Sequence, residues 1–246
     1  MRTLLVTSAV TFVPKNYDGL VLPLAQNPHI EGLIVIDNRS WTIVATALLL
    51  ILSGAAPRMG WQLLRNQFDD SIKRRNEAFT KEGKKVWIVH DINSPESLEL
   101  IASLQPDLIL NARTRSFFKK RLLAIPKMGC INIHHGLLPN QRGLMCDFWA
   151  HLLDTPAGFT LHEMTSKLDD GALLKVVEVP SDKKEYLKSL ETGASLEANA
   201  AAEVLSQVAT LGKIQGTENL KTDATVYRTN PRLRDFYRLR LRGVRI

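Results

Sequence analysis

Three polar residues in the second half of the chain have the types needed to catalyse attack on a carbonyl carbon. Asn132 and His134 lie in a strand-like run, and Asp169 lies in an Asp-Asp-Gly turn. An amide can donate to an oxyanion that develops on a carbonyl, and an imidazole can accept a proton from the attacking nucleophile. A carboxylate can orient the imidazole and stabilise its charged form. These side chains therefore fit a reaction in which a nucleophile adds to a carbonyl group.

The spacing of Asn132 and His134 indicates that they act on the same side of a strand. Residues two apart on a strand face the same way, so both side chains project together while Ile131 and Ile133 turn to the other side. The pair stands at the carboxyl end of the strand, where open α/β sheets build their sites. A histidine there also fits a purely structural role, so the surrounding sequence has to decide between the two interpretations.

The elements that position these residues follow from the alternation of apolar runs and helical patterns. Short runs rich in β-branched residues predict buried strands at residues 3–7, 33–37, 85–90, 107–111 and 130–134. Helical patterns fall between and after them, at residues 18–26, through Trp61, Leu64, Phe68 and Ile72 to a stop at Gly83, and at 94–104, 117–124 and 197–211. This alternation predicts an α/β fold with a doubly wound, mostly parallel sheet.

Composition places the chain among ordinary globular proteins. Its 246 residues are 45% hydrophobic and 23% charged, which fits one large domain or one domain with a small appendage. Cys130 and Cys146 form neither a disulfide framework nor a metal-binding set, so we expect a reducing compartment and no metal. The first residues lack a signal-peptide pattern, and we therefore expect a cytoplasmic protein.

The positive charge is concentrated at the end of the chain. The formal net charge is +7, and residues 221–246 contain seven arginines and one lysine against two aspartates. A basic tail of this kind can bind phosphates, anionic lipid or RNA. We favour a solvated helix whose leucines and aromatic residues pack on the body with the arginines outside, and we expect no nucleic-acid partner.

One apolar segment interrupts the α/β pattern. Residues 40–57 carry no charge and are flanked by Arg39, Arg58 and Trp61. Spanning a bilayer takes about 20 apolar residues, so the segment is short for that role. The favoured interpretation is a helix buried on the sheet. The alternative is a hydrophobic hairpin that rests in a membrane interface, giving a weak peripheral membrane association.

The sequence motifs around the three polar residues closely resemble the signature of the folate-dependent formyltransferases. That family includes methionyl-tRNA formyltransferase, glycinamide ribonucleotide formyltransferase and the sugar N-formyltransferases. The matching positions run in the family's order: Asn132, His134, Leu137, Leu138, Pro139, Arg142, Gly143, Trp149, Ala150, Gly158, Thr160, His162, Leu168, Asp169 and Gly171. The resemblance implies a formyltransferase-type, Rossmann-like fold.

The resemblance also implies a mechanism. A primary amine attacks the formyl carbon of formyl-tetrahydrofolate, which is a co-substrate, and no metal is required. Asn132 and protonated His134 stabilise the oxyanion, while Asp169 orients His134 and keeps it charged. By analogy with the family, the pterin lies against two loops, one formed by Asn111, Ala112 and Arg113 and the other by Leu168, Asp170 and Gly171.

Departures from the family pattern identify candidate substrate contacts. His135 replaces the proline or serine usual after the catalytic histidine, and it is either a substrate contact or a structural neighbour. Arg113 and Arg115 replace apolar residues of the folate loop, and they either meet the folate glutamate or an acceptor phosphate or belong to the loop surface. Arg142 of the Arg-Gly step is a third candidate substrate contact, whereas His162 is expected to support the site.

The acceptor is inferred by exclusion. The first loop, TSAVTFVPKNYDG, lacks the glycine-rich phosphate cradle of the glycinamide ribonucleotide enzymes. The chain is too short for the full tRNA-binding domain of the methionyl-tRNA enzymes. We therefore expect a small amine acceptor such as a nucleotide- or lipid-linked amino sugar. Residues 1–180 would form the catalytic domain, and residues 181–246 a helical, basic extension packed on it.

Two alternatives use the same fold. A formyl-tetrahydrofolate hydrolase would use the same three residues with water as the nucleophile, and it would release formate without any amine. A non-catalytic module would attach the fold to membrane or RNA through the basic tail and the apolar segment. Retention of Asn132, His134 and Asp169 argues against such a module, because a binding protein does not need that set.

Overall fold

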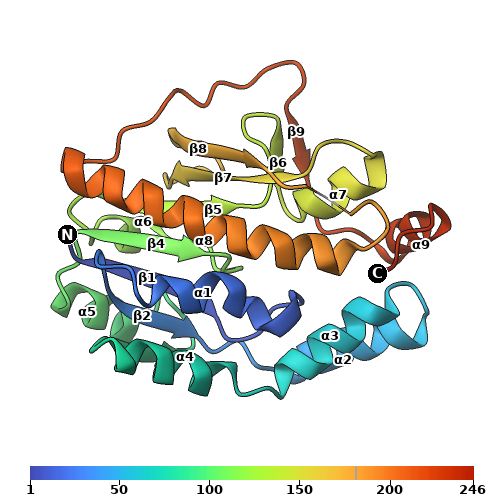
Figure 1. Ribbon diagram of the computed structural model, residues 1–246, viewed down its shortest axis with the longest axis horizontal. Coiled ribbons are helices and arrows are strands. Elements are labelled where there is room, and N and C mark those ends of the chain that lie inside the picture. The colour runs from blue at the N-terminus through green and yellow to red at the C-terminus, as the bar shows by residue number, and fades with distance from the viewer. Residues whose placement is uncertain (181) are drawn as a thin grey trace.

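The computed structural model describes residues 1–180 and 182–246. Its main feature is a seven-stranded sheet with the order β3-β2-β1-β4-β5-β7-β8 (Figure 1). The first five strands in this order pair in parallel, and β7 pairs antiparallel with both of its neighbours, β5 and β8. The strands are β1 (Thr3–Ser8), β2 (Ile30–Ile36), β3 (Lys85–Val89), β4 (Leu108–Ala112), β5 (Cys130–His134), β7 (Gly158–Glu163) and β8 (Leu173–Glu178). The predicted doubly wound, mostly parallel α/β sheet is confirmed.

Helices cover both faces of this sheet. Along β1, Leu5 faces one apolar core, and Leu4 and Val6 face the other, as alternating side chains of a doubly covered strand must. The helices are η1 (Pro14–Tyr17), α1 (Asp18–Leu24), α2 (Trp41–Leu52), α3 (Pro57–Gln67), α4 (Ser71–Lys81), α5 (Pro95–Ser103), α6 (Lys120–Leu123), α7 (Cys146–Leu153), α8 (Tyr186–Leu211) and α9 (Leu233–Leu241). Helices α1, α4, α7 and α8 contribute to the first core, as do a few residues of α2, α3 and α9, and α5 and α6 contribute to the second.

Two helix predictions need correction. The helix predicted through Trp61 and Ile72 is two helices, α3 and α4, and the chain turns between them. The Asp69 carboxylate accepts a hydrogen bond from the Ser71 backbone N–H (2.8 Å), which fixes the turn before α4. The helix predicted at residues 117–124 is shortened to α6 (Lys120–Leu123).

The favoured interpretation of residues 40–57, a helix buried on the sheet, is wrong. Helix α2 begins after a capping Ser40 and packs against α3, and only Ala47 and Leu50 of its residues are buried. Figure 1 shows α2 and α3 side by side as a hairpin at one end of the molecule. Within the described residues, no helix has the length and apolar character needed to cross a bilayer.

The last third of the chain returns over the sheet. Helix α8 packs on α1, on η1 and on β7, and it starts at Tyr186, well before the predicted residue 197. Strand β9 (Val226–Arg228) then pairs in parallel with β6 (Gln141–Gly143). The predicted domain boundary falls at residue 181, which lies outside the described ranges, so the division into two domains stays a prediction.

Helix α9 has the packing expected of the basic tail. Phe236 and Leu239 are buried against the body, while Arg234 and Arg238 keep about 73% and 63% of their side chains exposed. The terminal Ile246 is also buried, and its carbonyl accepts a hydrogen bond from the Arg58 backbone N–H. The tail therefore folds onto the α2–α3 hairpin.

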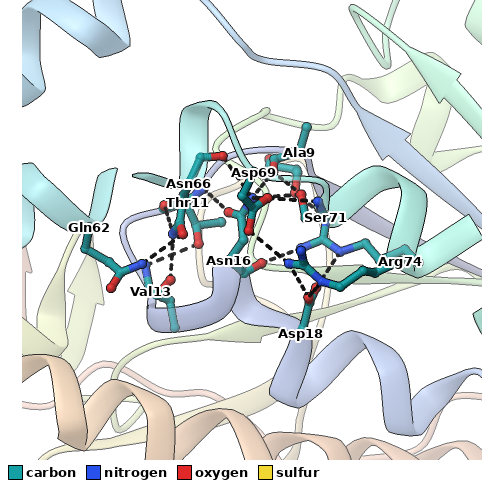
Figure 2. Close-up of polar contacts among 12 residues, drawn as sticks. Ala9, Thr11, Val13, Asn16, Asp18, Gln62, Asn66, Asp69, Ser71 and Arg74 are labelled. Carbon is teal, nitrogen blue, oxygen red and sulfur yellow. Dashed lines mark hydrogen bonds and ion pairs between the residues drawn. The ribbon is translucent and has the colours of Figure 1, made fainter. Parts of the chain in front are cut away.

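The loop between β1 and α1 is fixed by buried polar groups (Figure 2). Lys15, Asn16 and Tyr17 all have positive φ, a conformation that non-glycine residues rarely adopt. The Asn16 side chain accepts from the Thr11 N–H (2.7 Å) and donates to the Ser71 hydroxyl (2.9 Å). These bonds offset the cost of the strained backbone and keep Tyr17 at the carboxyl end of the strands.

Candidate active site

A row of polar side chains crosses three neighbouring strands. The strand register places Asn132 of β5 beside Asn111 of β4 and opposite His162 of β7. The Asn111 amide donates to the Asn132 oxygen (2.9 Å), and Asn132 Nδ2 lies 3.2 Å from His162 Nε2. An amide nitrogen carries two hydrogens, so Asn132 can hold His162 with one and offer the other to a ligand.

His162 serves this row as a neutral acceptor. Its Nδ1 lies 2.7 Å from the Glu163 carbonyl oxygen and acts as the donor there, which leaves Nε2 to accept from Asn132. Burial, assisted by nearby His134, lowers the pKa of His162 to about 4, so the ring is uncharged at neutral pH. This agrees with the expectation that His162 supports the site.

His134 and Asp169 form a buried pair beside Asn132. Nδ1 of His134 lies 3.4 Å from Asp169 Oδ1, and Nε2 lies 2.7 Å from the Gln141 carbonyl oxygen. Both ring nitrogens thus face acceptors, and only the doubly protonated imidazolium can donate to both. The other carboxylate oxygen, Oδ2, accepts from the Gly143 N–H (2.8 Å), which fixes its orientation. The His134 ring therefore lies between the Asp169 carboxylate and the Gln141 carbonyl.

The turn that carries Asp169 is held by hydrogen bonds from Arg142 and Asn219. Arg142 has no exposed surface, and its guanidinium donates to the Asp169 carbonyl and to the Asn219 side chain (2.7 Å). Asn219 in turn donates to the Asp169 and Gly171 carbonyls, both at 3.0 Å. A Cβ at Gly171 would lie 2.1 Å from the Glu163 carbonyl oxygen, so only glycine fits where the turn meets β7.

Gly136 gives the His134 ring its space. A Cβ at this position would lie 2.6 Å from His134 Nε2 and 2.5 Å from the Gln141 carbonyl oxygen. Any larger residue would therefore displace the ring or the carbonyl that it contacts. Sequence analysis did not single out Gly136, although its place directly after the paired histidines was a signal.

The residues predicted to hold folate belong to two segments near the His134–Asp169 pair. Asn111 and Ala112 end β4, next to the catalytic strand, while Leu168, Asp170 and Gly171 belong to the Asp169 turn. Arg113 is mostly buried, with 11% of its side chain exposed: its guanidinium lies 3.3 Å from the Asp147 carboxylate and over the Tyr17 ring at 4.7 Å. Burial lowers the pKa of Arg113 to about 10, so it stays charged at neutral pH.

The two arginines of this loop therefore differ. Arg113 is turned inward and paired with Asp147, with 11% of its side chain exposed. Arg115 is exposed and donates to the Asn230 side chain (3.2 Å). Contacts of either residue with folate or acceptor stay predictions.

His135 belongs to an internal polar cluster. Its Nε2 lies 2.9 Å from the Glu197 carboxyl group and 3.0 Å from the Tyr17 hydroxyl, and its Nδ1 lies 3.6 Å from Asp147. Burial raises the pKa of Glu197 well above its usual value. The cluster ties α8 to the catalytic loops. Sequence analysis missed Tyr17, Asp147, Glu197 and Asn219, which come from separate parts of the chain.

Comparison with known proteins identifies the family. A family model described as formyl transferase matches residues 72–206, which is more than half of the chain. The chain belongs to the formyl transferase family. The resemblance inferred from the motif is therefore confirmed, and the match extends beyond the motif on both sides.

Relatives of known name match this formyl transferase family member over about half of its length. Methionyl-tRNA formyltransferase of Geobacillus thermodenitrificans (strain NG80-2) is 36% identical over 130 residues, which cover 52% of this chain and 39% of that protein. Bifunctional polymyxin resistance protein ArnA of Wigglesworthia glossinidia brevipalpis is 32% identical over 124 residues, covering 50% of this chain and 18% of that protein. The match thus spans less than half of either relative.

Solved structures share the fold of this family member. A sugar N-formyltransferase from Shewanella sp FDAARGOS_354 superposes with a TM-score of 0.57 at 18% identity, covering 97% of this chain and 87% of that one. Phosphoribosylglycinamide formyltransferase from Anaplasma phagocytophilum gives a TM-score of 0.60 at 17% identity, covering 94% and 99%. These likenesses confirm the formyltransferase-type fold.

Two further observations concern what surrounds the site. A cavity of about 980 Å³ lies between α3 and the start of α8, and none of Asn132, His134 and Asp169 lines it. Within residues 1–180 and 182–246, no group of three His, Cys, Asp or Glu side chains is arranged to hold a metal ion. The catalytic candidates thus gather at the strand ends, away from this cavity.

Proposed function

We propose that this protein transfers a formyl group from formyl-tetrahydrofolate to a primary amine of a small acceptor. The observation that supports the proposal is the convergence of Asn132, His134 and Asp169 at the end of β5 in a member of the formyl transferase family. Each side chain is available for a different part of the reaction.

The amine nitrogen attacks the formyl carbon, and the carbonyl oxygen becomes an oxyanion. The free N–H of Asn132 and the imidazolium of His134 donate to this oxyanion, while Asp169 balances the positive charge of the ring. His134 Nε2 is bonded to the Gln141 carbonyl, so substrate binding must open that contact before Nε2 can donate. The amine proton passes through water to the leaving folate nitrogen as the carbon–nitrogen bond breaks.

We propose an amino sugar linked to a nucleotide or lipid as the acceptor. The loop after β1 is filled by the side chains of Asn16 and Asn66, and it lacks the glycines that would let a backbone cradle a phosphate there. Arg115 is exposed in the loop after β4, beside the catalytic strand, where a guanidinium suits a phosphate-bearing acceptor. A phosphate on the acceptor would therefore be bound from this second loop.

We further propose that the enzyme works in the cytoplasm. Cys130 and Cys146 are both free and buried, as expected of a protein from a reducing compartment. Burial raises the pKa of Cys130 to about 12, so its thiol is unreactive at neutral pH.

The first test is calorimetric binding of a non-reactive formyl-tetrahydrofolate analogue, followed by formyl transfer to a panel of amino-sugar acceptors. Asn132→Ala, His134→Ala and Asp169→Ala should each lower turnover by about 1,000-fold, which corresponds to about 4 kcal/mol of transition-state stabilisation. All three variants should keep the far-UV circular dichroism of the wild type. His90→Ala, which removes an exposed histidine away from the site, is the matched control and should keep full turnover.

Three results would overturn the proposal. Near-normal turnover in all three variants would remove the mechanism. Formate release without any amine would replace the transferase with a hydrolase. Failure of the folded wild type to bind the analogue would show that the motif no longer serves folate chemistry.

A further inference from the structure

Helix α2 exposes an apolar face to solvent. Its outward stripe consists of residues at helical spacing, namely Trp41, Ala45, Leu48, Leu49 and Leu52. Trp41 and Leu52, at its two ends, are each 82% exposed, and no residue of the helix carries a charge. A single exposed leucine is ordinary, whereas a continuous apolar stripe indicates an interaction surface.

Helix α9 lies beside the end of α2 and carries a further exposed apolar residue. The Tyr237 hydroxyl donates to the Ser53 carbonyl, and the Arg240 guanidinium donates to the Gly54 carbonyl, so α9 lies against the turn of the α2–α3 hairpin (Figure 1). Leu241, at the end of α9, is 86% exposed. The α2–α9 surface is defined here by its apolar residues Trp41, Leu48, Leu49, Leu52, Tyr237 and Leu241.

Positive charge borders this surface. Arg234 and Arg238 of α9 have exposed side chains, and both point near the same carboxylate, Asp235, at 3.9 and 3.7 Å. One carboxylate cannot neutralise two guanidinium groups, so the end of the molecule that carries exposed leucines also carries net positive charge. Apolar and cationic groups occur together in proteins that rest on anionic membranes.

We propose that the α2–α9 surface docks on an anionic lipid bilayer, with α2 lying in the plane of the interface. The 12 residues of α2 extend about 18 Å at 1.5 Å per residue, against a hydrocarbon core of about 30 Å, so the helix can lie in the interface but not span it. Trp41 would sit at the headgroup level, the leucines would enter the acyl boundary, and the arginines would bind phosphate groups.

A second copy of the chain fits this surface less well. A two-fold dimer through α2 and α9 would place the exposed arginines of both copies, Arg234 and Arg238, in one interface, and their like charges oppose such a contact. A bilayer rich in anionic lipid has the opposite charge, and it needs no matching pattern of hydrogen-bonding groups. The charge therefore favours lipid as the occupant.

The test is flotation of the full chain with vesicles of phosphatidylcholine alone or mixed with phosphatidylglycerol. The wild type should float with the anionic vesicles and less with the neutral ones, and added salt should weaken binding. The double variant Leu49→Asp/Leu52→Asp should reduce bound protein by about tenfold or more. Leu220→Asp, which charges a leucine 66% exposed elsewhere, is the matched control and should float like the wild type.

Tryptophan fluorescence gives an independent readout. Insertion of Trp41 into the interface should shift its emission to shorter wavelength on addition of anionic vesicles, and Trp41→Phe should remove most of that shift. No flotation of folded wild type, or equal flotation of the double variant, would overturn the proposal. So would a concentration-dependent dimer that the double variant abolishes without any vesicle binding, since the surface would then serve a second copy.

Discussion

The end of β5 buries polar side chains, whereas the α2–α9 surface exposes apolar ones. At the end of β5, polar groups are buried: His134 is 6% exposed and Asp169 is 4% exposed. On α2, large apolar groups face water. Each arrangement is unfavourable by itself, because buried polar groups need partners and exposed apolar groups lack them. The buried polar groups are bonded to partners within the chain, whereas the apolar stripe is available for a partner outside it.

The two regions also differ in how closely their geometry is fixed. Asp169 is held through its backbone by Arg142 and Asn219 and through its carboxylate by the Gly143 N–H. Helix α2 is held by apolar packing against α3 and by a few contacts at the hairpin turn. A small steric change should therefore affect chemistry at the first region and stability at the second.

Among changes of a single glycine in these two regions, the largest effect is expected from Gly136→Ala. The added methyl group would meet the His134 ring and the Gln141 carbonyl, so the imidazole would move from its place beside Asp169. Loss of that alignment should lower turnover by about 100-fold, or about 3 kcal/mol in the activation barrier. Steady-state kinetics on formyl transfer would measure the change.

The control for Gly136→Ala is Gly19→Ala on α1. A Cβ at Gly19 would lie 3.5 Å from the nearest side-chain atom, an ordinary contact distance, so turnover should stay normal. Wild-type kinetics in Gly136→Ala would show that the His134 ring has more freedom than its contacts indicate, and the contrast between the two regions would weaken.

A smaller effect concerns pH and the buried row of polar groups. The pKa of His162 is lowered to about 4 by burial, against about 6.5 in an unfolded chain. Between these values the unfolded state binds more protons than the folded state, so the free energy of unfolding should fall as pH falls from about 6.5 to about 4. Between pH 7 and pH 5, His162 should lower the free energy of unfolding by about 2 kcal/mol.

Denaturant unfolding at pH 7 and pH 5 would measure this contribution. His162→Gln keeps an acceptor for Asn132 but cannot take up a proton, so its stability should fall less than that of the wild type over the same interval. If the free energy of unfolding fell equally in the two proteins, groups other than His162 would cause the acid sensitivity.

The catalytic strand could be predicted from the sequence because neighbouring residues alone determine it. The alternation of Asn132 and His134 with two isoleucines fixes which side chains share a face, and the glycines of the motif mark the turns. The braces behind the site were not predictable in this way. Tyr17, Asn219 and Glu197 reach the site only through the tertiary fold, and no periodicity in the sequence connects them with His134 or Asp169.

The apolar segment shows a different kind of failure. Hydrophobic residues predicted that α2 would be buried, but burial also needs a free face on which the helix can pack. Other helices cover both faces of the sheet, so α2 packs mainly against α3 and places only Ala47 and Leu50 inside. The apolar stripe can be read from the sequence, but whether it is buried depends on the tertiary fold.

The smallest effect is expected at the α2–α3 hairpin, from Gly60→Ala. The two helices approach so closely that a Cβ at Gly60 would lie 2.6 Å from the Ala47 carbonyl oxygen and 2.8 Å from a side-chain carbon of Ile51. Alanine favours the helix more than glycine does, but the backbone carbonyl can move away only if α2 shifts, so the net loss of stability should be about 1 kcal/mol.

Thermal and denaturant unfolding would measure this loss, and turnover should stay at the wild-type value because no catalytic residue contacts Gly60. Gly193→Ala on α8 is the matched control: it gives the same helical advantage, and its Cβ would lie 3.7 Å from its nearest neighbours, so it should be neutral or stabilising. If Gly60→Ala instead lowered turnover as Gly136→Ala does, the hairpin and the catalytic strand would be mechanically coupled. Normal turnover with lowered stability would show that a glycine-to-alanine change in the hairpin affects stability without affecting catalysis.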